Sequence, residues 1–183
     1  MALPKSFSDL GISIGYSEPH LYYHEALDCL LLIVRREDST VPCERLMIRD
    51  AHGSNYCELP DLGGESVSFQ SVILGRSTPV VLLLCLRWEQ LNETIAGNWD
   101  GLFKLDLQSR TSTRLLSPSS VKLFPDCKSV HITQLLSMSE ESNTIIAVGG
   151  FHRHDGTTEY YVSRISLESF TITKLRQLEA VFA

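Results

Sequence analysis

The feature that most constrains the fold is an order of expected strands that occurs three times along 183 residues. Each copy has a continuous apolar strand, a polar link, an alternating strand, a tight turn and a short return strand. The apolar strands begin near Leu30, Val80 and Ile145. The alternating strands end at Asp50, Leu107 and Leu167. The regular order indicates an internal repeat of about 60 residues.

The spacing of apolar residues favours strands over helices throughout the chain. Apolar residues recur at every second position, and no convincing helical period occurs. The second and third copies are preceded by another strand candidate, which makes four strands per unit. Repeated four-stranded antiparallel sheets are typical of a β-propeller. We therefore expect an all-β fold in one domain, 1–183, with units at approximately 12–62, 63–125 and 126–180. A β-sandwich or barrel is the alternative.

The number of units raises the question of closure. Closed propellers typically have about 4 to 8 blades. Three four-stranded blades would form a partial β-propeller with two open ends, and open sheet edges pair readily with other chains. The sequence therefore predicts self-association, or further blades in a longer protein.

The third unit, residues 143–178, contains the most specific motif. An apolar run at residues 145–148 precedes the pair Gly149 and Gly150. Tyr160 and Tyr161 follow on the next strand, and Phe170 opens the last one. This order resembles a kelch repeat. In that pattern the glycines end an inner apolar strand where backbones crowd near the central channel, because glycine has no Cβ.

The resemblance covers the third unit well and the first two only by strand order. Where the glycines are expected, the first unit has Arg35 and Arg36 and the second has Arg87 and Trp88. Kelch-type propellers commonly act as protein-binding scaffolds, including the substrate-recognition parts of ubiquitin ligases. The resemblance thus implies a non-enzymatic protein-interaction module, which we favour over an enzyme, with a protein partner and no cofactor.

Basic and aromatic residues follow the apolar strand of each unit, before links such as residues 88–100. Equivalent positions in successive blades emerge on one face, so we expect these side chains to form a rim for an acidic peptide or a carboxylate ligand. The candidate partner-binding residues are Arg35, Arg36, Arg87, Trp88, His152, Arg153 and His154. Solvated strand ends are the simpler interpretation of the same residues.

His152, His154 and Asp155 are the densest group of possible metal ligands. A propeller-based enzyme, or a small-molecule or metal binder that uses this loop, is therefore the alternative function. However, no third histidine lies nearby in the sequence, and zinc sites need three or four ligands. No nucleophile elbow, phosphate loop or dinucleotide fingerprint occurs. We therefore assign no catalytic residue and no metal site.

Composition limits the partners further. The formal net charge of −6 and the absence of Lys or Arg runs longer than two argue against a nucleic-acid surface. The apolar runs are far shorter than the roughly 20 residues that span a bilayer, and the N-terminus has no signal-peptide core. We expect a cytoplasmic or nuclear protein that does not bind membranes. Its five cysteines lack Cys-x-x-Cys spacing, which favours reduced structural thiols.

Overall fold

The computed structural model describes residues 20–35, 43–50, 53–57, 67–91, 94–119 and 125–179. These residues form twelve β-strands and one short 3-10 helix, η2 (Glu25–Leu27). The expectation of an all-β fold is therefore confirmed. Among the described residues, no helix has the length and apolar character needed to cross a membrane.

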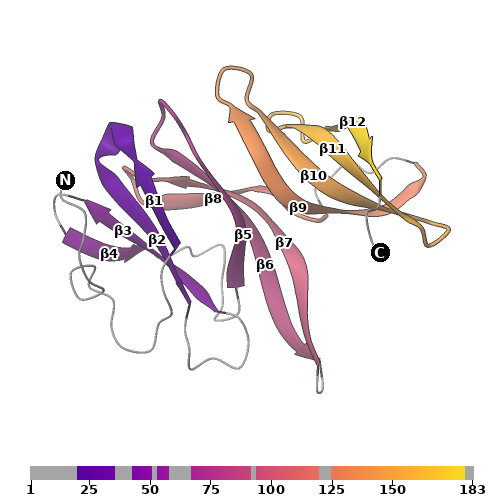
Figure 1. The fold of residues 1–183 in the computed structure, drawn as a ribbon, viewed down its shortest axis with the longest axis horizontal. Coiled ribbons are helices and arrows are strands. Elements are labelled where there is room, and N and C mark those ends of the chain that lie inside the picture. The colour runs from indigo at the N-terminus through magenta and orange to yellow at the C-terminus, as the bar shows by residue number, and fades with distance from the viewer. Residues whose placement is uncertain are drawn as a thin grey trace.

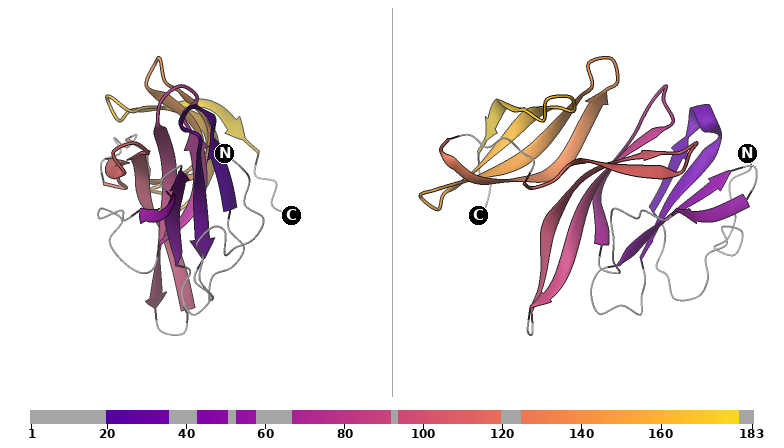
Figure 2. Two further views of the ribbon diagram at one scale, coloured as in Figure 1. Left: turned by 90° about the vertical axis from the view of Figure 1, so that its left-hand side faces the viewer. Right: turned by 180° about the vertical axis from the view of Figure 1, so that it is seen from behind.

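The strands form three separate four-stranded antiparallel sheets (Figures 1 and 2). Sheet 1 contains β1 (His20–His24), β2 (Cys29–Arg35), β3 (Glu44–Asp50) and β4 (Gly53–Cys57). Sheet 2 contains β5 (Val67–Leu74), β6 (Val80–Leu91), β7 (Thr94–Asp106) and β8 (Thr111–Leu116). Sheet 3 contains β9 (Cys127–Ser139), β10 (Thr144–Arg153), β11 (Thr158–Ser166) and β12 (Ile172–Leu178). In each sheet the spatial order equals the chain order, so simple hairpin connections suffice.

The apolar strands are the second strands of their sheets, and not the inner ones as the sequence suggested. β2, β6 and β10 each have a hydrogen-bonded neighbour on both edges. A strand covered on both edges and both faces must be apolar at nearly every position, which explains the continuous runs. The first strands of sheets 2 and 3 lie next to each other instead. Ser71 Oγ accepts from the Leu135 amide at 3.1 Å and donates to its carbonyl at 3.4 Å.

Sheet 2 is buried on both faces, between the other two sheets. Along β6, Val81, Leu83 and Cys85 pack with sheet 1, while Leu82 and Leu84 pack with sheet 3. All five are fully buried, at 0% exposure. Burying one leucine side chain stabilises a fold by about 1.5–3 kcal/mol. The alternation of β6 therefore joins the three sheets into one packed series.

The turns between the first and second strands of the sheets also contact one another in series. The Nε2–H of His24, at the end of β1, donates to the Thr78 carbonyl in the β5–β6 turn at 2.9 Å. From the other side, Glu140 Oε1 in the β9–β10 turn accepts from the Arg76 amide at 2.8 Å, the Ser77 amide at 3.4 Å and the Thr78 hydroxyl at 3.0 Å. We call this carboxylate contact the turn latch.

The expected link at residues 88–100 is wrong, because β6 and β7 continue through most of it as a paired hairpin. We call it the β6–β7 arm; it projects from sheet 2 in Figure 1. Its polar and glycine-rich composition suggested a loop, but cross-strand pairing satisfies the backbone. Gly97 lies opposite Trp88. A Cβ at Gly97 would lie 2.9 Å from Trp88 Cζ3, so the glycine is needed for the close approach of the indole ring.

Candidate functional site

The glycine pair of the third unit lies inside β10 and does not end it. The strand continues through His152 and Arg153 after Gly149 and Gly150. A Cβ at Gly150 would approach Tyr160 Cε1 to 3.1 Å, tighter than most side-chain contacts. The glycine therefore makes room for the tyrosine ring on the neighbouring strand. This local packing explains the motif without a crowded central channel.

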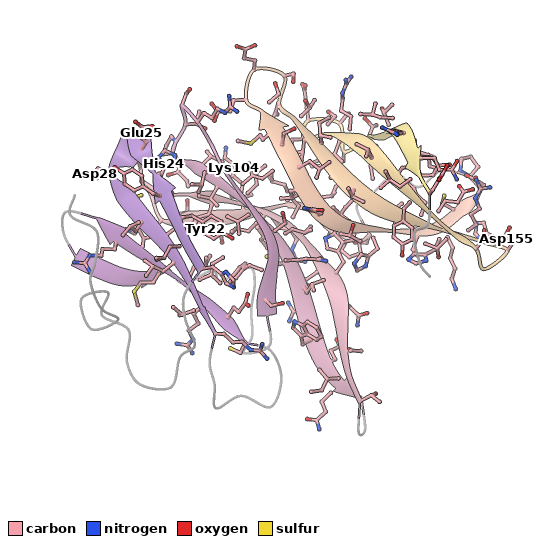
Figure 3. The ribbon with its side chains drawn as sticks, in the orientation of Figure 1. Tyr22, His24, Glu25, Asp28, Lys104 and Asp155 are labelled. Atoms are coloured by element: carbon pink, nitrogen blue, oxygen red, sulfur yellow. The ribbon has the colours of Figure 1, made fainter. Side chains whose placement is uncertain are left out.

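A tight turn at residues 154–157 joins β10 to β11 and shows Asp155 at its tip (Figure 3). Asp155 Oδ1 accepts from the hydroxyl of Thr157 at 2.6 Å and from its amide at 2.9 Å. These hydrogen bonds lower the pKa of the Asp155 carboxyl. Gly156 has a φ of 87°, in the left-handed region that favours glycine. Asp155 is thus engaged in shaping the turn.

An open pocket of about 400 Å³ lies beside this turn. It is lined by Lys128, Ser129, His152, Arg153, His154 and Gly156. We call it the β9–β10 pocket. It brings together three of the residues expected at the site, His152, Arg153 and His154. Lys128 and Ser129 were missed by the sequence analysis, because only the antiparallel register, which places Ser129 opposite His152, brings them there.

The guanidinium of Arg153 is held by two carboxylates of its own sheet. Its Nη1 lies 3.2 Å from Asp126 Oδ2, and its Nη2 lies 2.6 Å from Glu159 Oε2. The hydroxyl of Tyr161 donates to the same Glu159 oxygen at 3.0 Å. The hydrogen bond between Arg153 and Glu159 raises the pKa of Arg153 and lowers that of Glu159. Arg153 therefore mainly stabilises the pocket wall, and its charge is already engaged by carboxylates of the protein.

Aromatic packing supports the pocket from behind. Phe151 is fully buried and meets Tyr161 edge to face, with ring centroids 5.4 Å apart. The ammonium of Lys174 lies 4.6 Å from the Phe151 ring centroid and 4.5 Å from that of Tyr161. Such contacts between a cation and aromatic faces are attractive. This cluster fixes the strand from which His152 and Arg153 extend.

Arg87 and Trp88 of the expected rim have contacts within sheet 2. Arg87 Nε lies 3.2 Å from Asp100 Oδ1, which also belongs to sheet 2. Trp88 Nε1 donates to Ser68 Oγ at 2.7 Å. Arg35 ends β2, where it lies opposite Glu44, and Arg36 lies outside the described residues. Asp100 also pairs with Arg114, at 3.0 Å, so Arg87 shares this carboxylate with a second guanidinium. The shared cationic rim stays a prediction.

Metal-binding geometry is absent from the part of the chain that the structure describes, where no three His, Cys, Asp or Glu side chains group as ligands. Four cysteine side chains are buried: Cys29, Cys43, Cys85 and Cys127. The side chain of Cys57 lies outside the described part. Burial raises the pKa of the Cys85 thiol well above its ordinary value.

Comparison with known proteins shows the fold class. No protein-family model matches the sequence, and no curated protein matches it. Among solved structures, the chain is similar to a Hadza microbial sialidase, Hz136, with a TM-score of 0.51 and 13% sequence identity. The match covers 91% of this chain and 38% of the sialidase chain. At this identity the likeness shows the fold alone.

The chain is therefore an all-β partial β-propeller, and sheets 1, 2 and 3 are its blades. Nothing among the described residues shows the three blades closing into a ring. The more specific kelch resemblance stays a prediction.

Proposed function

We propose that this protein is a non-enzymatic interaction or scaffold module that binds a protein partner at the β9–β10 pocket. The observation that carries the proposal is the meeting of His152, Arg153 and His154 with Lys128 around one open pocket. The kelch-like third unit supports the same role. A substrate-recognition role in a ubiquitin ligase, and a cytoplasmic or nuclear location, remain predictions from that resemblance.

The contacts within the pocket indicate which residues a partner would meet. Arg153 is occupied by Asp126 and Glu159, and His152 Nδ1 is 2.8 Å from the Thr158 hydroxyl. Lys128 and His154 are exposed to solvent. A partner that presents carboxylates or other hydrogen-bond acceptors would therefore bind mainly through Lys128 and His154.

The test compares three forms of the chain in quantitative affinity purification from the native cell type. The double variant K128A/H154A removes the two exposed pocket side chains without touching the ion pairs of Arg153. R176A, which replaces an exposed arginine of β12 outside the pocket, is the matched control. We expect a specific partner to be depleted at least tenfold with the double variant and unchanged with R176A. Equal recovery of every partner with all three forms would refute the proposal.

A small-ligand site in the same pocket is the second candidate, favoured by its volume. About 400 Å³ lies within the roughly 300–1,000 Å³ range of small-molecule sites. The sialidase name of the structural neighbour suggests a sialoside as the first ligand to try. Saturable binding of a sialoside to the intact chain in calorimetry, lost in K128A/H154A, would support this candidate. Absence of binding, or equal binding by K128A/H154A, would count against it.

A further inference from the structure

The turns of blades 1 and 3 share one geometry. Each has four residues, 25–28 in blade 1 and 140–143 in blade 3, between the first and second strands. The last residue is left-handed in both, with φ 44° at Asp28 and 47° at Asn143. The first residue is a glutamate in both, Glu25 and Glu140. Glu25 in blade 1 is therefore equivalent in position to Glu140 in blade 3. Glu140 is the residue that makes the turn latch to blade 2.

Glu25, labelled in Figure 3, is exposed, and so are His20, Leu21 and Tyr23 on the preceding strand, β1. Leu21 and Tyr23 on β1 are 52% and 49% exposed. Both lie opposite buried residues of β2 on the face of blade 1 that is turned away from blade 2. β1 and the turn that follows it thus carry a carboxylate and two exposed apolar side chains.

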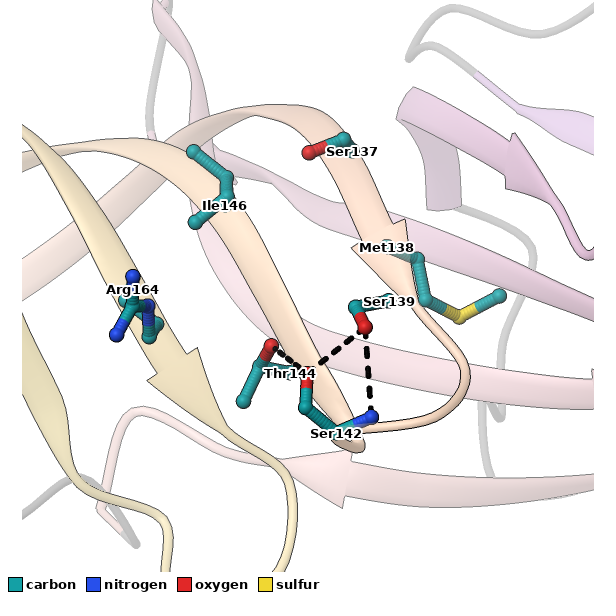
Figure 4. Close-up of a pocket in the computed structure, with 7 residues that line it drawn as sticks. All are labelled: Ser137, Met138, Ser139, Ser142, Thr144, Ile146 and Arg164. Atoms are coloured by element: carbon teal, nitrogen blue, oxygen red, sulfur yellow. Dashed lines mark hydrogen bonds between the residues drawn. The ribbon is translucent and has the colours of Figure 1, made fainter.

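Blade 3 has a complementary pocket beside the turn between β9 and β10. It has a volume of about 420 Å³ and is lined by Ser137, Met138, Ser139, Ser142, Thr144, Ile146 and Arg164 (Figure 4). The Ser142 hydroxyl lies 2.8 Å from the hydroxyls of both Ser139 and Thr144. Arg164 is exposed beside them. Hydroxyls with a guanidinium are donors that suit a carboxylate.

The blade 3 pocket also lies at the turn, residues 140–143, that would accept a turn latch from a following blade. In blade 2, the turn at residues 75–79 supplies the donors to Glu140. The equivalent turn of blade 3, residues 140–143, supplies Ser142 to the pocket. On the adjoining inner strand, Leu136 is 46% exposed. Blades 1 and 3, the outer two of the three described blades, therefore hold the two halves of a contact already made between blades 2 and 3.

We propose that blade 3 of one copy binds blade 1 of a second copy, with Glu25 of one copy seated in the pocket beside Arg164 of the other. The occupant is a second copy because both halves of the contact belong to this chain and their charges are opposite. The buried cluster of Leu30, Leu32, Val34 and Met47 confines the contact on blade 1 to β1 and its turn. Such a head-to-tail contact closes when its rotation allows, and the described blades of two copies number six, within the range of about 4 to 8 for closed propellers.

The experiment is sedimentation velocity of the intact chain over a wide concentration range. We expect a dimer that dissociates on dilution. The single variants R164E and E25R each place like charges in the contact and should weaken dimerisation at least tenfold. The double variant E25R/R164E restores opposite charges and should recover most of the affinity. R176E is the control for an exposed charge on the same blade and should leave the dimer unchanged.

Three results would overturn the proposal. The first is a monomer at every concentration, and the second is a dimer that R164E weakens no more than R176E does. The third is failure of the double variant to recover when each single variant remains folded by circular dichroism. K128A/H154A, which tests the β9–β10 pocket, lies outside this contact and should dimerise normally.

Discussion

The sharpest test of the packing behind the β9–β10 pocket is replacement of Phe151 by alanine. The ring is fully buried between blades 2 and 3, and it meets Tyr161 edge to face beneath the ammonium of Lys174. F151A removes all of these contacts together. It also leaves a cavity in the core, because the two packed sheets cannot easily move to fill it. The same change loosens β10, which carries His152 and Arg153.

The expected cost follows from the burial. Phe→Ala substitutions at fully buried sites destabilise proteins by about 3–5 kcal/mol, from lost transfer free energy and the residual cavity. An edge-to-face aromatic pair accounts for about 0.5–1.5 kcal/mol of such a loss. F151L keeps most of the volume and loses the aromatic contacts, so it should cost about 1–1.5 kcal/mol. Y161F keeps both rings and removes only the hydroxyl contact to Glu159, so its effect should be smaller still.

Urea denaturation followed by tryptophan fluorescence measures these differences. With a slope of about 2 kcal/mol/M, F151A should lower the midpoint by about 1.5–2.5 M. If F151A is too unstable to purify, F151L and Y161F still give the predicted order. A loss below about 1 kcal/mol for F151A, or a larger loss for Y161F than for F151L, would refute the packing argument.

Two further predictions concern single ionisable groups. Desolvation raises the pKa of Glu140, but the hydrogen bonds from Thr78, Ser77 and Arg76 outweigh it and leave the pKa below its ordinary value of about 4.3. The turn latch therefore stabilises the fold above that value, and the stabilisation is lost as the pH falls through the lower pKa of the folded state. In urea denaturation, the wild type should be more stable than E140Q at pH 7, and this difference should shrink below pH 4. An equal difference in stability at pH 7 and below pH 4 would contradict the argument. The Cys85 thiol, at 0% exposure and with a raised pKa, should resist alkylation at pH 8 until the chain is unfolded, and mass spectrometry showing native modification would contradict its burial.

Local pattern was sufficient to predict the strands and their grouping. The period of two and the continuous runs at β2, β6 and β10 placed the apolar strands correctly, because alternation and burial are recorded in consecutive residues. The β6–β7 arm was not predicted, because the interactions that form it are not recorded in consecutive residues. Its stability comes from cross-strand pairing and from Trp88 over Gly97, and neither leaves a signal in neighbouring residues.

The candidate site likewise has residues that the sequence could predict and residues that it could not. His152, Arg153 and His154 are adjacent in the chain, so the sequence could nominate them together. Lys128 joins them only through the register of β9 on β10. The pairing of Arg153 with Asp126 and Glu159 likewise left no signal in the sequence, since it depends on how one turn and two strands meet in space.

The amino-acid sequence by itself determined an all-β chain of three similar four-stranded units, because strand period and turn chemistry are local properties. Only the tertiary structure decided which strands of blades 2 and 3 lie side by side, which charges are already paired, and how Glu140 joins blade 3 to blade 2. These features depend on distances between residues about 60 positions apart, such as Thr78 and Glu140. Packing of whole sheets sets those distances, and no short stretch of the chain encodes them.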